Sequence, residues 1–150
     1  MFTEKNIHLK EVDSTNNYAI SLKNTTVFKD GLVVSADFQT KGKGQRGSYW
    51  ESENGKNILL TAVFELDLKL YNQFDISKIV AVSIVEFLEG LGLRALIKWP
   101  NDILIGKQKV AGVLIQNMIS KNIIRHSVIG IGLNVNQLKF LDYNPTATSL

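Results

Sequence analysis

The segment from Asn57 to Leu66, NILLTAVFEL, constrains the fold of this chain more than any other. It is nearly all apolar from Ile58 to Phe64. A strand that is covered on both faces has this pattern, whereas a strand with one wet face alternates apolar and polar residues. The segment therefore predicts a strand in the interior of a sheet, with neighbouring strands on both sides.

Other segments supply these neighbours. NIHLKEV and GLVVSADF predict strands, and DSTNNYAISLK between them predicts a helix capped by Asp13 or Ser14. LRALIKW predicts a strand that Pro100 interrupts, and DILIGKQKVAGVLIQNMI predicts a hairpin with its turn near Gly106 to Gln108. SKN predicts the turn into a last strand, IIRHSVIGIGLNV.

The segment from Asp75 to Leu91 predicts a long helix. Its apolar residues recur at steps of three and four, which places them on one helix face: Ile76, Ile79, Val80, Ile84, Phe87, Leu88 and Leu91. Strands outnumber helices and return by hairpins, so the sequence predicts an α+β fold with a mixed, mainly antiparallel sheet backed by helices. A chain of 150 residues with 45% apolar composition is expected to form one domain.

Composition excludes several classes of protein. The absence of cysteine excludes disulfides and cysteine metal ligands, and His8 and His126 have no metal-ligand spacing. A net charge of +3 is far from that of a dedicated nucleic-acid binder, so no nucleic-acid partner is expected. No signal peptide is evident, and no apolar run approaches the ~18 residues of a membrane span. We therefore expect a cytoplasmic protein without a membrane partner.

The segment QTKGKGQRGSYW, residues 39–50, combines glycines and cations without an acid: Gly42, Gly44, Gly47, Lys41, Lys43 and Arg46. Backbone amides turned inward by glycines and reinforced by cations make a concavity for phosphate or carboxylate. The spacing is neither that of a Walker loop nor that of the dinucleotide fingerprint. The residue types alone leave an anion site and a flexible solvated loop equally open.

Several separate motifs, in the same order, resemble those of the biotin protein ligases. They are DSTNN, QTKGKGQRG followed by a Trp, GKN leading into a strand, KWPND, KVAG and GIGLNVN. The resemblance runs from about Glu11 to the end and implies the catalytic domain of these enzymes, which is like that of class II aminoacyl-tRNA synthetases. It also implies a two-step ligase reaction. ATP first adenylates biotin to biotinyl-AMP, and a lysine of the biotin carboxyl carrier protein of acetyl-CoA carboxylase then attacks to form an amide.

The resemblance implies the residues of the site. Those expected to bind biotin or biotinyl-AMP are Ser14, Thr15, Asn16, Gln39, Gly42, Lys43, Gly44, Gln45, Arg46, Trp50, Lys109 and Gly112. Lys109 and Arg46 are the expected catalytic residues, and Asn101, Asp102 and Asn134 are expected on the ATP side. Mg²⁺ is expected to be bridged by ATP oxygens, with no certain protein ligand.

Several of these residues have a plainer alternative role. Ser14 can cap a helix, and Asn101 and Asp102 after a proline are common turn residues. Lys109 can point to solvent from a hairpin, yet a lone lysine in the apolar strand KVAGVLI is costly unless it meets an anion. The family resemblance favours the ligand-binding role in each case.

The basic loop departs from the family pattern Gly-Arg-Gly-Arg-Arg-Gly, because this chain has GKGQRG. Lys43 keeps the positive charge of an arginine but loses its two-pronged hydrogen bonding. Gln45 removes a positive charge beside the activated intermediate. We therefore hypothesise weaker retention of biotinyl-AMP than in relatives with the full basic set.

Family members usually continue past NPTATSL, so residues 1–150 are expected to form a biotin ligase catalytic domain that is incomplete at its C-terminus, without an N-terminal DNA-binding domain. Two other functions stay open: a truncated, non-catalytic biotin-binding module and a lipoate-type protein ligase. The basic loop and KWPND favour biotin over lipoate. A homodimer formed by exposed sheet edges is expected by analogy only.

Overall fold

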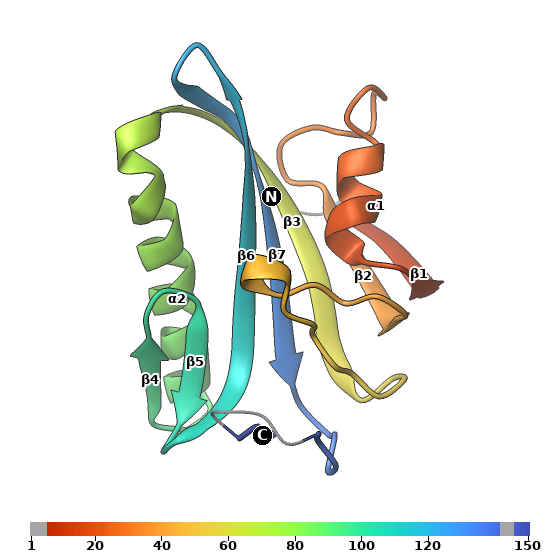
Figure 1. The fold of residues 1–150 in the computed structure, drawn as a ribbon, viewed down its shortest axis with the longest axis vertical. Coiled ribbons are helices and arrows are strands. Elements are labelled where there is room, and N and C mark those ends of the chain that lie inside the picture. The colour runs from red at the N-terminus through yellow and green to blue at the C-terminus, as the bar shows by residue number, and fades with distance from the viewer. Residues whose placement is uncertain (1–5, 142–145) are drawn as a thin grey trace.

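The computed structural model describes residues 6–141 and 146–150, and these form a seven-stranded sheet with the order β1-β2-β3-β7-β6-β5-β4 (Figure 1). The strands are β1 (Asn6–Val12), β2 (Val33–Gln39), β3 (Asn57–Lys69), β4 (Ala95–Lys98), β5 (Asp102–Ile105), β6 (Gln108–Ser120) and β7 (Ile123–Asn134). β1 and β2 are parallel, and the other neighbouring strands are antiparallel. The predicted mixed, mainly antiparallel sheet is confirmed.

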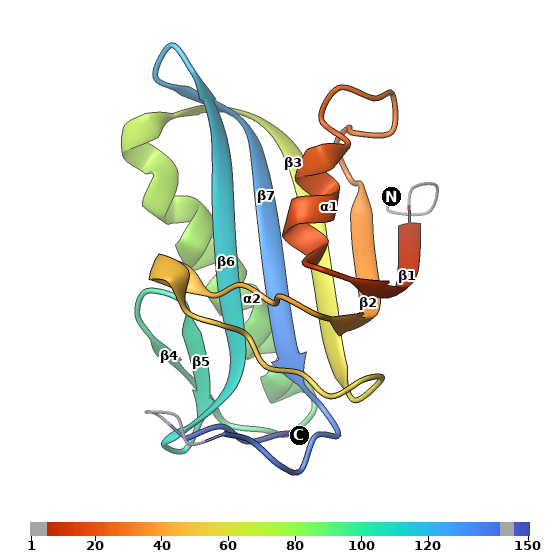
Figure 2. The same ribbon diagram turned by 45° about the vertical axis from the view of Figure 1, so that its right-hand side comes forward.

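The helices α1 (Thr15–Ser21) and α2 (Gln73–Gly90) lie on opposite faces of the sheet (Figure 2). α1 and the loop that follows β2 lie in front of the sheet in this view, and α2 lies behind it. Short 3₁₀ turns, η1 (Gln45–Gly47) and η2 (Leu70–Asn72), occur within this loop and before α2. Among the described residues, no helix is long and apolar enough to span a membrane.

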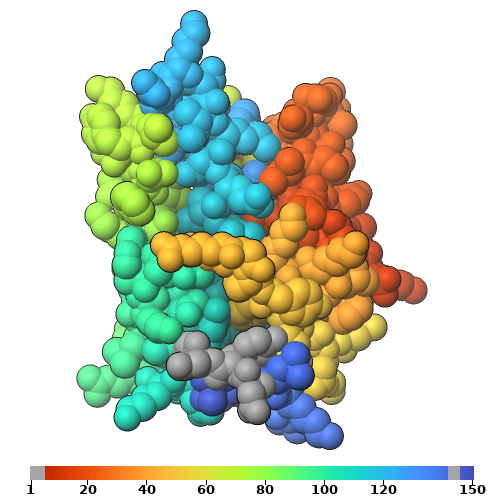
Figure 3. All heavy atoms as spheres, viewed as in Figure 1, coloured from red at the N-terminus to blue at the C-terminus, as the bar shows by residue number. Residues whose placement is uncertain are grey.

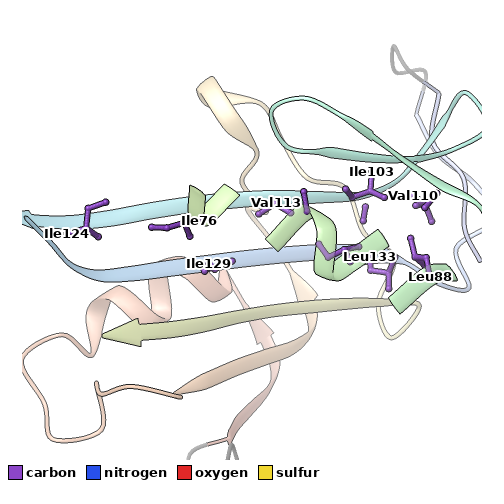
Figure 4. Packing of buried hydrophobic residues seen from close by; sticks show 12 residues of the cluster. Ile76, Leu88, Ile103, Val110, Val113, Ile124, Ile129 and Leu133 are labelled. Carbon is purple, nitrogen blue, oxygen red and sulfur yellow. The ribbon is translucent and has the colours of Figure 1, made fainter. Parts of the chain in front are cut away.

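The two faces of the sheet carry different side chains because successive residues of a strand point in opposite directions. On β7, Ile129 and Leu133 pack in the larger hydrophobic cluster with Ile76 and Leu88 of α2 (Figure 4). A smaller cluster lies under α1 and includes Ala19, Leu32, Val34, Val63 and Val128. Between Ile129 and Leu133, the residues of β7 that face α1 are Gly130 and Gly132. The α1 face therefore has no side chains where the core face has large apolar ones.

The predicted coverage of α2 and β3 is only partly correct. On α2, Ile76, Ile84 and Leu88 are buried, but Ile79 is 67% exposed and Phe87 is 53% exposed. On β3, Ile58 at the predicted doubly covered end is 40% exposed. The reason is that α2 lies over β4, β5 and β6. An apolar groove of about 610 Å³ stays open between α2 and β3.

The predicted turns occur where the sequence placed them. Gly106 has a φ of 60° in the turn between β5 and β6, and Lys121 and Asn122 have φ of 50° and 62° between β6 and β7. The two histidines lie apart on the sheet, His8 on β1 and His126 on β7. His8 lies 3.0 Å from Ser35 and 3.1 Å from Asp37 on the exposed surface of β1 and β2, and the ring of His126 packs beside Phe28.

Candidate functional site

The start of α1 is buried against the sheet. Ser14 takes the N-cap position, but its side chain makes no capping hydrogen bond, so helix capping does not account for this residue. The backbone N–H of Thr15 donates to Gln39 Oε1 at 2.8 Å, and the Thr15 hydroxyl oxygen lies 3.0 Å from the same atom. These bonds join the start of α1 to the end of β2, and Ser14, Thr15 and Gln39 are all buried there.

The glycine-rich loop closes on itself as a small hairpin. The N–H of Trp50 donates to Gly42 O at 3.0 Å, and the N–H of Gly44 donates to Ser48 O at 2.8 Å. A Cβ at Gly42 would overlap Trp50 O, and one at Gly44 would overlap the Ser48 hydroxyl. The expected concavity of open amides is therefore wrong for Gly44, because its N–H is used within the loop; Gly42 and Gly44 are needed for close approach of the backbone.

The tip of this loop is positively charged and lies over β6 (Figure 3). Arg46 is exposed and has a left-handed φ of 55°. Lys43 Nζ donates to Asn17 Oδ1 at 2.8 Å, and Asn17 Nδ2 donates to Asp13 Oδ2 at 2.6 Å. The hydrogen bond from Asn17, assisted by the charge of Lys43, lowers the pKa of Asp13 below its ordinary value. Lys43 thus ties the loop to α1.

The floor of the site is made of glycines. A Cβ on Gly132 would overlap the Trp50 indole, and a Cβ on Gly112 would lie 2.8 Å from the same ring. Gly130 allows the same close approach to the Asn16 carboxamide. Sequence reasoning selected Gly112 but missed Gly130 and Gly132. Glycines at alternate positions of a strand are a signal for close approach of another group, and that signal was present in the segment GIG.

Lys109 Nζ lies 2.7 Å from Asp102 Oδ1 and 5.4 Å from the centre of a Trp50 ring. The more distant Lys98 Nζ is 3.9 Å from Asp102 Oδ2. Both partners of the close ion pair are largely buried, with side chains 25% and 15% exposed. Lys109 therefore does not point to solvent, which was the alternative open to it.

A β-bulge places Lys109 on this face of the sheet. Ile103 pairs with Ala111, but the next residue of β5, Leu104, pairs with Lys109, which leaves Val110 as an extra residue in β6. Val110 and Ala111 both pack in the larger hydrophobic cluster. Without the extra residue, Lys109 would share the face of Ala111 and point into that cluster. Bulges re-aim side chains in this way.

Two cavities meet at Lys109 and Trp50. The smaller, of about 50 Å³, is lined by Ser14, Thr15, Asn16, Gln39, Lys43, Gly44 and Gly112. The larger, of about 440 Å³, is lined by Arg46, Asp102 and Asn134. Asn101 and Gln45, like Lys109 and Trp50, line both. Among the predicted site residues, Gly42 alone lines neither, and its place is inside the loop hairpin.

Asn134 lies at the wall of the larger cavity and is 2% exposed. Its Nδ2 donates to Thr148 O at 3.0 Å, while its Oδ1 is buried without a hydrogen-bond partner among the described residues. A buried oxygen of this kind is rare in folded proteins unless a ligand or water meets it.

Residues 9–134 match the biotin/lipoate A/B protein ligase family. The chain belongs to this family. It is 35% identical over 132 residues to the bifunctional ligase/repressor BirA of Bacillus spizizenii, a match that covers 87% of this chain and 40% of the relative. It is 30% identical over 126 residues to the biotin–[acetyl-CoA-carboxylase] ligase of Mycobacterium tuberculosis, covering 81% of this chain and 45% of the relative.

A solved structure of a biotin protein ligase has the same fold. The biotin protein ligase from Aquifex aeolicus, in complex with biotin and ATP, matches 97% of this chain and 59% of its own with a TM-score of 0.77 and 34% identity. The expected biotin ligase catalytic fold is confirmed. The present chain matches less than half the length of the two curated relatives, BirA and the Mycobacterium tuberculosis ligase. The roles of its individual residues stay predictions.

Proposed function

We propose that this chain activates biotin with MgATP to biotinyl-5'-AMP and transfers biotin to a lysine of the biotin carboxyl carrier protein of acetyl-CoA carboxylase. The observation that supports this most is the position of Lys109, which lines both the smaller, polar cavity and the larger cavity beside Asp102. We assign the head group of biotin to the smaller cavity and the nucleotide to the larger one.

The smaller cavity offers the hydrogen-bonding groups that a ureido ring needs. Such a ring has two N–H donors and a carbonyl acceptor, and Ser14, Thr15 and Gln39 bring hydroxyl and carboxamide groups to the cavity. Its volume of about 50 Å³ is too small for the bicyclic ring while Trp50 lies against the glycine floor. Ligand entry therefore requires Trp50 and its loop to shift.

The central difficulty of the first step is the repulsion between a carboxylate and a triphosphate. In that step a biotin carboxylate oxygen attacks the α-phosphorus of ATP, and the bond to pyrophosphate breaks. Lys109 and Arg46 supply positive charge from two distant segments to the same larger cavity. Fixed charge of this kind lowers the barrier by holding the anions together and stabilising the transition state.

In the second step, the amine of the carrier lysine attacks the acyl carbon of biotinyl-AMP. The acyl–oxygen bond breaks, AMP leaves with its electron pair, and the amine loses a proton as the amide forms. Lys109 and Arg46 then hold the charge of the departing phosphate. The loop hairpin over the glycine floor shields the activated acyl group from water.

Magnesium fits the larger cavity by its donor chemistry. Mg²⁺ prefers oxygen ligands and keeps several waters, and the buried Asn134 Oδ1 and the Asp102 carboxylate are oxygen donors at this cavity. Within residues 6–141 and 146–150, no cluster of three or more His, Asp or Glu side chains could hold a metal. Asp102 and Asn134 would hold the ion, which would neutralise phosphate charge.

The direct test mixes the chain with biotin, MgATP and a purified carrier domain. We expect pyrophosphate release and a mass increase of the carrier equal to one biotinyl group. Biotin binding in calorimetry without pyrophosphate release would instead indicate a non-catalytic biotin-binding module. Transfer of lipoate but not of biotin would indicate the lipoate-type activity. No binding of either acid would contradict the proposal.

The assignment of residues 1–150 to an incomplete catalytic domain, the cytoplasmic location and the homodimer stay predictions. The sheet edges that a dimer would use are β1 and β4.

A further inference from the structure

A buried chain of hydrogen bonds crosses the sheet behind the smaller cavity. It runs from Gln116 on β6 to Asn16, then to Thr61 on β3 and to the Thr15 hydroxyl, and the backbone N–H of Thr15 joins it to Gln39 at the end of β2. Asn16, Thr61, Thr15 and Gln39 are each at most 6% exposed. Of these residues, Gln116 and Thr61 do not line the cavity and have no role in the proposed reaction so far.

The orientation of the Asn16 carboxamide follows from its partners on β6. Its Nδ2 lies 3.3 Å from the carbonyl oxygen of Leu114 and 2.9 Å from Gln116 Oε1. A backbone carbonyl can only accept, so the Asn16 nitrogen must face β6. Asn16 Oδ1 then faces β3, where Thr61 Oγ1 lies 2.6 Å away.

This orientation sets the direction of every later bond in the chain. Thr61 has one hydroxyl proton and donates it to Asn16 Oδ1, because that oxygen only accepts. The Thr15 hydroxyl has one proton and two oxygen neighbours, Thr61 Oγ1 at 2.8 Å and Gln39 Oε1 at 3.0 Å. It donates to Thr61, the nearer of the two, because the proton of Thr61 is already used. Gln39 Oε1 accepts from the backbone N of Thr15 at 2.8 Å and keeps its second lone pair for a ligand.

The opposite orientation of Asn16 would remove this acceptor. Thr61 would accept from Asn16 and donate to Thr15, and the Thr15 hydroxyl would donate to Gln39 Oε1, 3.0 Å away. Both lone pairs of that oxygen would then be occupied. Without Gln116, only the longer bond from Asn16 Nδ2 to the Leu114 carbonyl, 3.3 Å against 2.9 Å, would hold the productive orientation.

We propose that Gln116 is a positioning residue for the ligand cavity: acting through Asn16 and Thr61, it keeps Gln39 Oε1 free to accept from an N–H group of the ligand. This inference rests on the proposed function, in which that group is a ureido N–H of biotin. It assigns to β6 a part in head-group specificity that is separate from the charge of Lys109.

The test measures biotin binding by calorimetry for the wild-type chain and three variants. Gln116→Met removes the acceptor, and Thr61→Val removes the relay at constant shape. Each is expected to raise the Kd for biotin about tenfold, the effect of one buried hydrogen bond. Gln116→Glu keeps an acceptor and cannot donate, so it is expected to bind biotin within about twofold of wild type, because the direction of the chain is retained.

Two further readouts separate positioning from a structural effect. The double variant Gln116→Met/Thr61→Val is expected to bind no more weakly than either single variant, because both break the same chain. ATP binding is expected to be unchanged in all variants. Ser127→Ala is the matched control: it removes a 2.9 Å bond to Asn117 on the same strand pair, outside the chain, and leaves biotin affinity unchanged.

The outcomes distinguish this inference from the proposed function. Wild type that fails to bind biotin overturns both. Wild type that binds biotin, with Gln116→Met unchanged or with Gln116→Glu as weak as Gln116→Met, overturns the positioning role alone. If Gln116→Met fails to fold, Thr61→Val and Gln116→Glu still decide the question.

Discussion

Lys109 is held by a carboxylate on one side and an aromatic face on the other. Its ammonium is 2.7 Å from Asp102 and 5.4 Å from a Trp50 ring. A lysine stem is flexible, so restraint by two partners removes much of the entropy that an arriving anion would otherwise have to overcome. The cation is therefore oriented before the ligand arrives.

Replacement of Lys109 by Met tests this arrangement. We expect pyrophosphate release to fall by about 10²- to 10³-fold, the loss typical of removing one charge-stabilising group from a reaction site. Stability should fall by only about 1 kcal/mol, because the pair with Asp102 retains contact with water and Lys98 stays near. Lys107→Met is the control, since Lys107 is exposed in the adjacent turn. A folded Lys109→Met chain with normal turnover contradicts the assignment.

Gln45 lines both cavities, where the family pattern has an arginine. Gln45→Arg is expected to slow the release of biotinyl-AMP about tenfold, because an added charge-assisted hydrogen bond to phosphate contributes about 1.5 kcal/mol. Release can be followed by chasing labelled biotinyl-AMP from the protein. An unchanged release rate means that position 45 does not face the intermediate.

At the scale of secondary-structure elements, the site is made by irregularities in regular strands. The bulge at Val110 turns Lys109 away from the core, and the glycines of β6 and β7 open a floor for Trp50. The bulge lies near the start of β6, and a further register shift occurs between β6 and β7 at Met118 and Ile119. The core face of the same strands is filled by residues such as Ile129 and Leu133.

Gly132→Ala tests the floor. Its methyl group would overlap the Trp50 indole, so we expect a loss of about 1–3 kcal/mol in urea unfolding, as in other overpacked sites. The penalty should largely disappear in a Trp50→Ala background, which would identify the ring as the cause. Gly90→Ala is the control, because a Cβ there meets open space near the end of α2. An equal loss in both Trp50 backgrounds contradicts the close contact.

The sequence predicted elements with a clear period and missed features that depend on pairing. β1 and the hairpin of β5 and β6 were predictable because their apolar patterns and turn residues are local. The bulge was not predictable, since regular alternation of side chains along KVAGVLI places Lys109 on the same face as Ala111 and Val113. The partial exposure of α2 was also missed, because a helix pattern cannot tell how far over the sheet the helix lies.

The candidate site shows the same division. Motif resemblance selected most residues around the two cavities, including Lys109 and Asn134. It missed Thr61 and Gln116, whose importance comes from three strands and a helix meeting across the sheet. The only local sign of Thr61 and Gln116 was that each is a polar residue at an inward-facing position of an apolar strand.

At the scale of the whole molecule, the two faces of the sheet are unequally covered. The α1 face carries the polar site, and the α2 face combines a buried core with an open apolar groove of about 610 Å³. Two neighbouring residues of α2 lie on either side of the boundary between the open groove and the buried core. Phe87 borders the groove and is 53% exposed, whereas Leu88 is fully buried.

These two neighbours should respond oppositely to substitution. Leu88→Ala is expected to cost about 2–5 kcal/mol in urea unfolding because it leaves a cavity in the core. Phe87→Gln should change stability by about 0.5 kcal/mol or less, since the ring is already half in water. It should nevertheless lower the fluorescence of the dye ANS bound to the native chain, because the dye binds exposed apolar surface. A large loss of stability in Phe87→Gln, with unchanged dye binding, would show that α2 lies closer to β3 than the open groove allows.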